Sequence, residues 1–268
     1  EVLSGELELG GSTLGGMIVV ASGSLLDLRG SHTVQSDIDV DGSVAMEAGT
    51  IVVQGGYDVA EMTTVGGTVT FDQLPTQMNL SEVSGSLTFG FPEAIAFPAV
   101  AFSGGNWEHA GPVTVTEFEW SHGNLRGDGV FTVPAGGSLV IPAGSNVPQL
   151  IAKTMRVEGD TTFAEGQLRL ATGAVFENLG VFEMQGDLLV NTGGGSANVF
   201  DNQGTFRKSG GEGEGRFSAG VPVTNTGTLE VLSGTLTLDG DVTQTGGRVA
   251  AIDATLNYAR DIMFEGGR

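Results

Sequence analysis

Two stretches of the chain carry side chains whose types and spacing suit chemistry. The first is an aromatic and acidic cluster that contains Trp107, Glu108, His109, Trp120 and His122. On adjacent strands the two indoles could form a platform beside these charged groups, which suits stacking against sugars, and a Glu/His pair suits acid–base work. The alternative is that both indoles fill the interior, because they occupy apolar positions of an alternating pattern. The alternation favours the interior.

The second stretch is Asp37-x-Asp39-x-Asp41-Gly42, which matches the opening of a calcium-binding loop. A helix–loop–helix calcium site needs Glu at loop position 12, which here is Ala48. On a strand, the three Asp side chains share one outer face at a spacing of about 7 Å, so they can hold one Ca²⁺ weakly and also repel one another. Ca²⁺ at Asp37, Asp39 and Asp41 is the one cofactor that the sequence suggests.

The charge balance narrows the range of partners. The net charge is −21, and residues 1–125 hold one base, Arg29, against 16 acidic residues. Such a surface repels phosphates, which excludes nucleic acid as a partner. The chain has no cysteine, so it has neither disulfides nor thiol chemistry. Its apolar runs are too short to cross a bilayer, and we expect no direct membrane insertion.

The elements that position these side chains are short strands separated by glycines. A Gly, one small or polar residue and an apolar residue recur, with successive Gly spacings of 18 to 25 residues, at Gly5, Gly23, Gly42, Gly67, Gly85, Gly105 and Gly123. Each Gly permits the positive φ of a sharp corner, and the long step from Gly42 to Gly67 suggests an extra strand or an enlarged corner.

Short alternating strands that return at this period predict an all-β fold, a single-stranded parallel β-helix (β-solenoid). We call one full turn of the chain a rung. At about 20 residues each, the chain makes about 13 rungs and a rod about 60 Å long. The drifting rung length favours the right-handed form. No change in composition divides the chain, so residues 1–268 are expected to form one continuous domain.

The clearest copy of the period is an apolar-x-Asn-x-Gly-x-apolar phrase written three times. The Asn and Gly of the three copies are Asn178 and Gly180, Asn202 and Gly204, and Asn225 and Gly227. An Asn column can line a ligand groove, or it can stack at a corner with its amides bonded to neighbouring rungs. The Gly two residues later marks a corner and favours a structural ladder.

Two other features bear on organisation. Residues 209–216 are rich in Gly and Glu and suggest a flexible protruding loop. Residues 1–9 closely match residues 230–238, so the two ends resemble each other instead of forming polar caps. We expect the chain to be a segment of a longer polypeptide, or a subunit that associates end to end.

The phrases at 200–210, 225–231 and 233–238 resemble the β-helix repeats of large bacterial surface and secreted proteins. That group includes autotransporter passengers and filamentous-haemagglutinin-like adhesins. The resemblance implies the β-helix fold and an extracellular or cell-surface location. It carries no catalytic motif that could be transferred to this chain.

Together these patterns favour a non-catalytic structural or adhesive segment that acts as a stiff rod, with surface glycans or proteins as partners. One alternative is a carbohydrate-binding or carbohydrate-cleaving β-helix module, and another is a subunit of an end-to-end extracellular filament. A polysaccharide lyase pairs a calcium-binding acidic cluster with a base, yet Arg29 is the only Arg or Lys before Arg126. With 32 acidic residues, a carboxylate pair at glycosidase spacing arises by chance. We therefore expect no enzyme.

Overall fold

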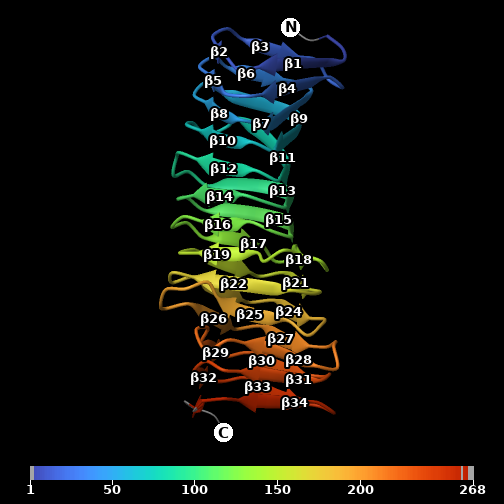
Figure 1. Cartoon of the computed structure of the whole chain (residues 1–268), viewed down its shortest axis with the longest axis vertical. Coiled ribbons are helices and arrows are strands. Elements are labelled where there is room, and N and C mark those ends of the chain that lie inside the picture. Colours follow the sequence, from blue (N-terminus) through green and yellow to red (C-terminus); the bar gives the residue numbers. More distant parts are fainter. Residues whose placement is uncertain (1–2, 261, 265–268) are drawn as a thin grey trace.

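The computed structural model describes residues 3–260 and 262–264 of the chain. These residues form 35 strands, stacked from the N-terminal to the C-terminal end along one axis (Figure 1). Every strand pairing among them is between parallel neighbours one rung apart, as in β1 with β4 and β23 with β26. No helix occurs among the described residues, and hence none that could cross a membrane.

Each rung contributes a strand to each of three faces. Face 1 consists of β3 (Ile18–Val20), β6 (Ile38–Val40), the first parts of β9 (Tyr57–Val65), β11 (Gln77–Val83), β13 (Ile95–Phe102) and β15 (Val113–Trp120), and then β17 (Phe131–Val133), β20 (Thr154–Val157), β23 (Val175–Asn178), β26 (Val199–Asn202), β29 (Val223–Asn225), β32 (Val242–Gln244) and β35 (Ile262–Phe264). Face 2 consists of β1 (Glu6–Gly10), β4 (Leu25–Arg29), β7 (Ser43–Ala48), the last parts of β9, β11, β13 and β15, and then β18 (Ser138–Ile141), β21 (Asp160–Phe163), β24 (Val181–Met184), β27 (Thr205–Lys208), β30 (Thr228–Val231) and β33 (Arg248–Ala251).

Face 3 is a separate 13-stranded sheet. It consists of β2 (Thr13–Leu14), β5 (His32–Val34), β8 (Thr50–Val53), β10 (Thr68–Phe71), β12 (Ser86–Phe89), β14 (Asn106–His109), β16 (Asn124–Arg126), β19 (Gln149–Ile151), β22 (Gln167–Ala171), β25 (Leu189–Thr192), β28 (Glu214–Phe217), β31 (Thr235–Leu238) and β34 (Thr255–Tyr258). Because each face holds one strand per rung, the predicted parallel β-helix of about 13 rungs is confirmed. Its right-handedness stays a prediction.

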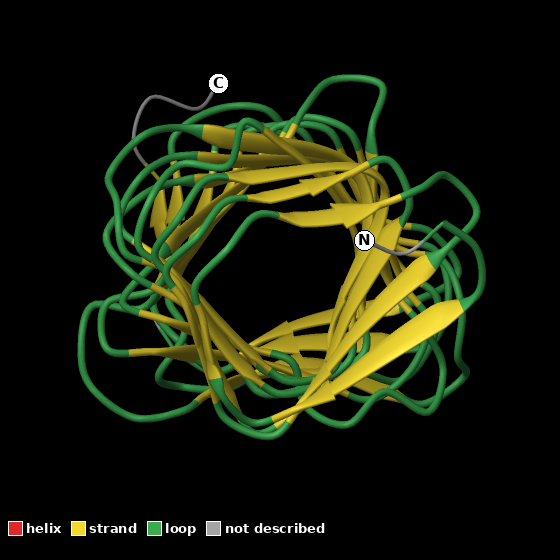
Figure 2. Cartoon of the chain, turned by 90° about the horizontal axis from the view of Figure 1, so that it is seen from above, coloured by secondary structure: helices red, strands yellow, loops and turns green. Residues whose placement is uncertain are grey.

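The period-two alternation of the sequence builds the core. In β24 the outward Val181 and Glu183 alternate with the buried Phe182 and Met184. Seen along the axis, the strands surround a central space that such buried side chains fill (Figure 2). In-register pairing then stacks identical side chains of neighbouring rungs. The rings of Phe182 and Phe206, for example, lie 5.5 Å apart at an interplanar angle of 19°.

The recurring glycines mark two different corners of the rung. Gly23 and Gly42 precede strands of face 2, whereas Gly67 and Gly85 precede strands of face 3. The 25-residue step between Gly42 and Gly67 is therefore a change of corner. The expectation of an extra strand or enlarged corner there is wrong, because β8 is an ordinary strand of face 3.

Close approach between rungs, and not positive φ, explains the glycines of the repeated phrase. A Cβ on Gly204 would lie 2.1 Å from the carbonyl oxygen of Gly180, and one on Gly227 would lie 2.0 Å from that of Gly204. None of these three glycines has a positive φ. The corner is tight because successive backbones touch there, so any side chain would force the rungs apart.

The two similar segments at the ends do not occupy equivalent places. Residues 6–9 lie in β1 on face 2, whereas their counterparts at 235–238 form β31 on face 3. Residues 1 and 2 lie outside the described part of the chain. Sequence similarity here reflects the shared needs of a strand after a Gly corner, and not the same position in the rung.

Candidate functional site

The structure places both tryptophans inside the solenoid. Trp107 is 1% exposed and Trp120 is 0% exposed. The indole of Trp107 meets four rings edge-on, those of Phe97, Phe102, Phe118 and Phe131. The interior position that the alternation favours is therefore confirmed, and the alternative of an exposed platform is wrong, because both indoles occupy inward positions of their strands. Glu108 and His122 are exposed whereas His109 is buried, so the five side chains share no surface.

The buried His109 belongs to an interior polar contact. Its Nε2 lies 2.9 Å from the carbonyl oxygen of Glu93, and its own carbonyl accepts a hydrogen bond from Lys153 Nζ at 3.1 Å. Burial lowers the pKa of His109, and it lowers the pKa of Lys153 to about 8 although Asp128 opposes the shift. These groups hold rungs together and do not face a substrate-accessible surface.

The three aspartates of the predicted calcium stretch are exposed on and beside β6. Their side-chain oxygens do not come within 4.8 Å of one another as a set. Asp37 Oδ1 instead accepts a hydrogen bond of 2.8 Å from the backbone N of Gly56, and Asp39 lies opposite Asp58 on the next rung. Among the described residues these three carboxylates therefore do not form a group that could hold one ion.

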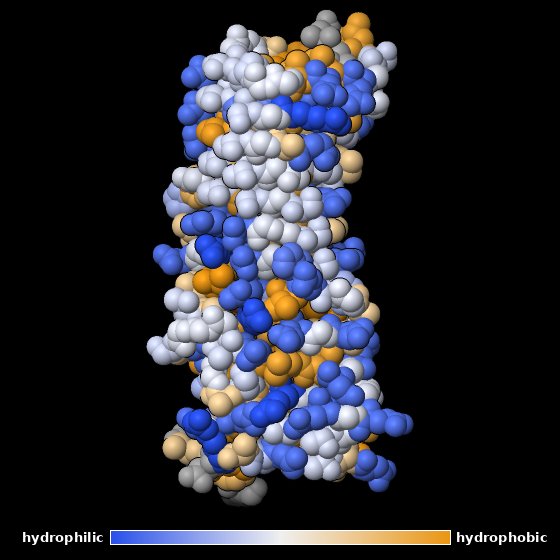
Figure 3. Space-filling view, in the orientation of Figure 1, coloured by the Kyte–Doolittle hydropathy of each residue, from blue (hydrophilic) through white to orange (hydrophobic). Residues whose placement is uncertain are grey.

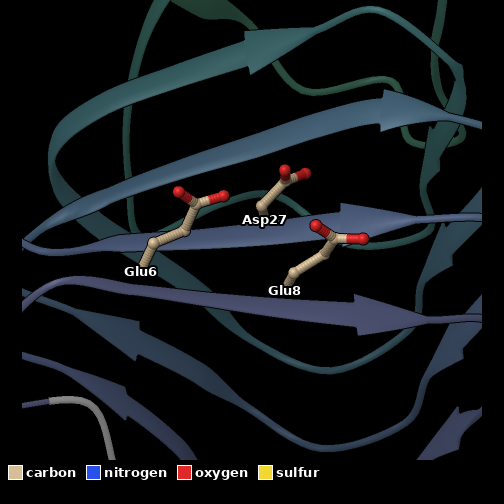
Figure 4. Close-up of side chains that lie close together, drawn as sticks. All are labelled: Glu6, Glu8 and Asp27. Atoms are coloured by element: carbon tan, nitrogen blue, oxygen red, sulfur yellow. The ribbon is translucent and has the colours of Figure 1, made fainter.

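A different acidic cluster lies on face 2, in the first two rungs. Glu6 and Glu8 belong to β1 and Asp27 to β4, and the parallel register sets Glu8 directly opposite Asp27. One carboxylate oxygen from each residue lies within 4.8 Å of the other two. Figure 4 shows the three carboxylates on the same side of the two strands, with that of Asp27 between the other two. It is the only such group of three among the residues that the structure describes.

Arg29 compensates part of this charge. Its Nε donates a hydrogen bond of 2.7 Å to Asp27 Oδ2, and its Nη1 lies 3.5 Å from Glu8 Oε2. The carboxylate of Asp27, followed by that of Glu8, raises the pKa of Arg29 above its usual value. Asp27 is only 2% exposed, and its second oxygen, Oδ1, has no hydrogen-bond partner. The cluster thus retains a buried acceptor that no residue in the described part of the chain satisfies.

The repeated Asn residues form a ladder inside the solenoid. Asn178 Nδ2 donates to Asn202 Oδ1 at 2.7 Å, Asn202 Nδ2 donates to Asn225 Oδ1 at 2.5 Å, and Asn225 Nδ2 donates to Gln244 Oε1 at 2.8 Å. All four side chains are buried. The amides of Asn178 and Asn202 also donate to the backbone carbonyls of Thr205 and Thr228, at 3.0 and 2.8 Å. Such a buried column joins rungs and offers no groove for a ligand.

An uncharged stripe lies on face 3 of the first five rungs. The outward positions of β2, β5, β8, β10 and β12 carry hydroxyl groups and one Val, and no acid or base among them; they are Thr13, Thr33, Thr50, Val52, Thr68, Thr70, Ser86 and Thr88. In Figure 3 a pale stripe runs over these strands in the upper half of the molecule. A shallow depression of about 550 Å³ opens at its N-terminal end, lined in part by Thr13, Thr33 and Thr50.

Sequence reasoning missed the acidic cluster because the Gly spacing differs by one residue from the register in which the strands pair. The Gly corners before Glu6 and Ser24 lie 18 residues apart, which would set Glu8 opposite Leu26. The strands pair with an offset of 19, which sets Glu8 opposite Asp27. One residue moves a side chain to the other face of a strand. The signal that could have found it was the alternation Leu26-Asp27-Leu28, which marks Asp27 as outward.

Comparisons with known proteins identify no relative of this chain. No protein-family model matches the chain, and neither the curated proteins nor the solved structures contain a significant match to it. The fold and the side-chain geometry described above therefore carry what can be inferred about function.

Proposed function

We propose that this chain is a non-catalytic structural or adhesive segment of an extracellular or cell-surface protein, and that it acts as a stiff rod. The observation that carries the proposal is the continuity of the stack, in which strands of faces 2 and 3 pair in every rung and those of face 1 pair in every rung except between β11 and β13. Main-chain hydrogen bonds run along the axis of such a stack, so bending the rod must stretch or break many of them at once.

Interior contacts between rungs support the same role. The Asn ladder and the stacked Phe rings link consecutive rungs over residues 176–244. In the polar–aromatic cluster of the sequence, both indoles and His109 serve the interior, which leaves no grouped acid–base pair there. A rod that holds distal parts of a protein away from a surface needs mechanical continuity and no catalytic residues.

Deletion of whole rungs tests the rod. Asp160, Val181, Thr205 and Thr228 occupy equivalent positions, so removing residues 160–227 deletes three rungs and joins Gly159 to Thr228. Placed between a cell-surface anchor and an epitope tag, the shortened chain should fold and bring the tag about 14 Å closer to the surface. Fluorescence energy transfer from the tag to a membrane dye measures this change.

A matched control deletes residues 160–192, which ends in the middle of a rung. Joining Gly159 to Gly193 places strands of face 2 against strands of another face, and we expect misfolding and loss of the tag signal. The rod proposal would be contradicted if the biological activity of the parent protein survived removal of three rungs yet was lost on changing individual outward side chains.

The uncharged stripe favours a second candidate function, binding of a neutral polysaccharide. A chain of net charge −21 keeps the outward positions of five consecutive strands free of charge, with hydroxyl groups that donate and accept hydrogen bonds. Thr68 and Thr70 lie at the centre of the stripe. Thr70→Lys should abolish cosedimentation with an insoluble neutral polysaccharide, whereas Thr224→Lys, outward on face 1, should leave it unchanged. Equal binding by both variants would eliminate this candidate.

A further inference from the structure

We propose that Glu6, Glu8 and Asp27 form a Ca²⁺ site that clamps the first rung to the second. The three carboxylates come from two adjacent strands of face 2 and converge on one side of them (Figure 4). This site differs from the Asp37, Asp39 and Asp41 stretch of the sequence, and it goes beyond the role of the chain as a rod.

The distances suit one cation shared by all three residues. Ca²⁺ binds oxygen ligands at about 2.3–2.6 Å, so two oxygens on opposite sides of the ion can lie up to about 5 Å apart. The ligand oxygens of the cluster lie within 4.8 Å of one another. The donor set is entirely carboxylate, with no imidazole or thiolate, and such a set selects a hard cation.

The buried oxygen of Asp27 points to a ligand independently of the acidic clustering. Arg29 satisfies Oδ2, yet Oδ1 is enclosed and accepts no hydrogen bond from the residues that the structure describes. Leaving a buried carboxylate oxygen without a partner is unfavourable, and buried charges in proteins are normally paired or bound to metal. A cation between the strands would satisfy Oδ1 and draw on Glu6 and Glu8 for its remaining protein ligands.

The local charge leaves room for a divalent ion. Three carboxylates and the one guanidinium of Arg29 sum to −2, which a single Ca²⁺ neutralises. Glu6 makes no salt bridge with any described residue, and the contact between Glu8 and Arg29 is long, at 3.5 Å. Both glutamates are exposed, so their carboxylates can turn toward the ion at little conformational cost.

In the extracellular location proposed above, Ca²⁺ bound in this way would couple the stability of the first rung to the surrounding calcium concentration. β1 has a pairing partner on one side only, β4, among the described strands. The ion would add a second connection between these two strands, on top of their main-chain hydrogen bonds. Binding to the folded state alone stabilises that state by mass action.

Calorimetric titration with CaCl₂ and hydrogen exchange test the site together. The intact chain should bind Ca²⁺ with a Kd of about 0.1–1 mM, as extracellular modules do, and 5 mM CaCl₂ should slow amide exchange in residues 6–29. Glu6→Gln, a change at an exposed side chain, should weaken binding by about tenfold and remove most of the protection. Arg29→Gln should tighten binding because it removes the competing cation.

Asp58→Asn is the matched control. Asp58 lies opposite Asp39 on the adjacent rung of face 1, so the variant loses one negative charge without changing a residue of the cluster. Its Ca²⁺ affinity and its protection of residues 6–29 should equal those of the unmodified chain. If Asp58→Asn weakens binding as much as Glu6→Gln, or if the unmodified chain gives no binding heat and no protection with CaCl₂, the proposal is wrong.

Discussion

The rungs of residues 6–152 and those of residues 153–264 share one backbone plan and differ in how side chains join consecutive rungs. In the first set, the salt bridges among described residues all involve Arg29, and acids face acids, as in Asp39 and Asp58. In the second set, most bases pair with acids of a neighbouring rung, although Glu177 also lies opposite Asp201; the pairs are Arg156–Glu177, Arg207–Glu230, Glu230–Arg248, Lys208–Asp187, Arg216–Asp239 and Arg260–Asp241.

The interiors differ in the same way. The first set is joined by apolar and aromatic contacts around Trp107, whereas the second adds the amide ladder from Asn178 to Gln244. The comparison teaches that a parallel β-helix can tolerate a one-sided surface charge where its core is apolar. It also indicates that the second set of rungs depends on specific polar contacts, which single substitutions can break.

Asn202→Ala should have the largest effect. It removes the only ladder donor to Asn225 Oδ1 and the acceptor for Asn178 Nδ2, and it leaves a cavity. We expect a loss of about 4 kcal/mol in the free energy of unfolding, measured by urea denaturation. Val157→Ala, at the equivalent position one rung before Asn178, is the control and should cost about half as much. Equal losses would mean that the ladder contributes packing alone.

Lys208→Met should destabilise the second set of rungs by about 3 kcal/mol. Lys208 is fully buried, and its Nζ donates to Asp187 Oδ1 at 3.2 Å and to the carbonyls of Gly210 and Gly211 at 2.6 and 3.1 Å. These contacts tie Gly210 and Gly211 to the interior, and residues 214–216 lie in β28, so the loop predicted at residues 209–216 is confined to residues 209–213. Limited proteolysis within residues 209–216 should accelerate in the variant, and unchanged cleavage would contradict this role.

Lys153→Met should stabilise the chain, in contrast to the two substitutions above, and raise its free energy of unfolding by about 2 kcal/mol at pH 7. The pKa of Lys153 is about 8 in the folded chain against 10.5 when unperturbed, so the unfolded state binds more protons between these values. The free energy of unfolding of the unmodified chain should therefore rise as the pH increases from 8 toward 10.5, by about 3 kcal/mol in total.

The Lys153→Met variant should lack this increase in the free energy of unfolding above pH 8. Burial also raises the pKa of Tyr57, and that group lowers stability once the unfolded tyrosine ionises near pH 10. Urea denaturation of both proteins at pH 7, 8, 9 and 9.5 separates the two effects. A stability profile that is parallel in the two proteins would show that Lys153 does not titrate in this range.

Charge reversals should give the smallest effects, and their signs should differ between the two sets of rungs. Asp58→Lys replaces an acid–acid pair by an acid–base pair and should stabilise the chain by about 0.5 kcal/mol at low salt. Glu230→Lys sets a base between Arg207 and Arg248 and should destabilise it by a similar amount. Both differences should shrink in 1 M NaCl. Effects of the same sign would remove the contrast between the two sets.

The sequence predicts the fold well because the period-two alternation and the Gly corners act locally. Gly85-Ser86-Leu87 begins β12, and Gly204-Thr205-Phe206 begins β27. It does not predict which face a corner belongs to, because a Gly before a strand looks the same at either corner. That ambiguity produced the wrong interpretation of the step from Gly42 to Gly67.

The sites depend on which residues of neighbouring rungs lie opposite each other, and a local sequence pattern does not determine this register. Asp37 and Asp39 are neighbours in the sequence yet do not act together, whereas Glu8 and Asp27 are 19 residues apart and meet. The inward position of Trp107 depends only on the alternation along its own strand, and the sequence indicated it correctly. A register known to one residue would have recovered the acidic cluster from the sequence.

Both lysines of the chain, Lys153 and Lys208, lie inside the solenoid, with exposed fractions of 3% and 0%. Acylating reagents and amine-directed cross-linkers therefore find no side-chain amine on the surface of the intact rod, and trypsin finds no accessible lysine. Each lysine becomes reactive only when its own rungs separate. The rate at which each one is acylated consequently reports local opening at two defined heights along the rod, without any introduced label.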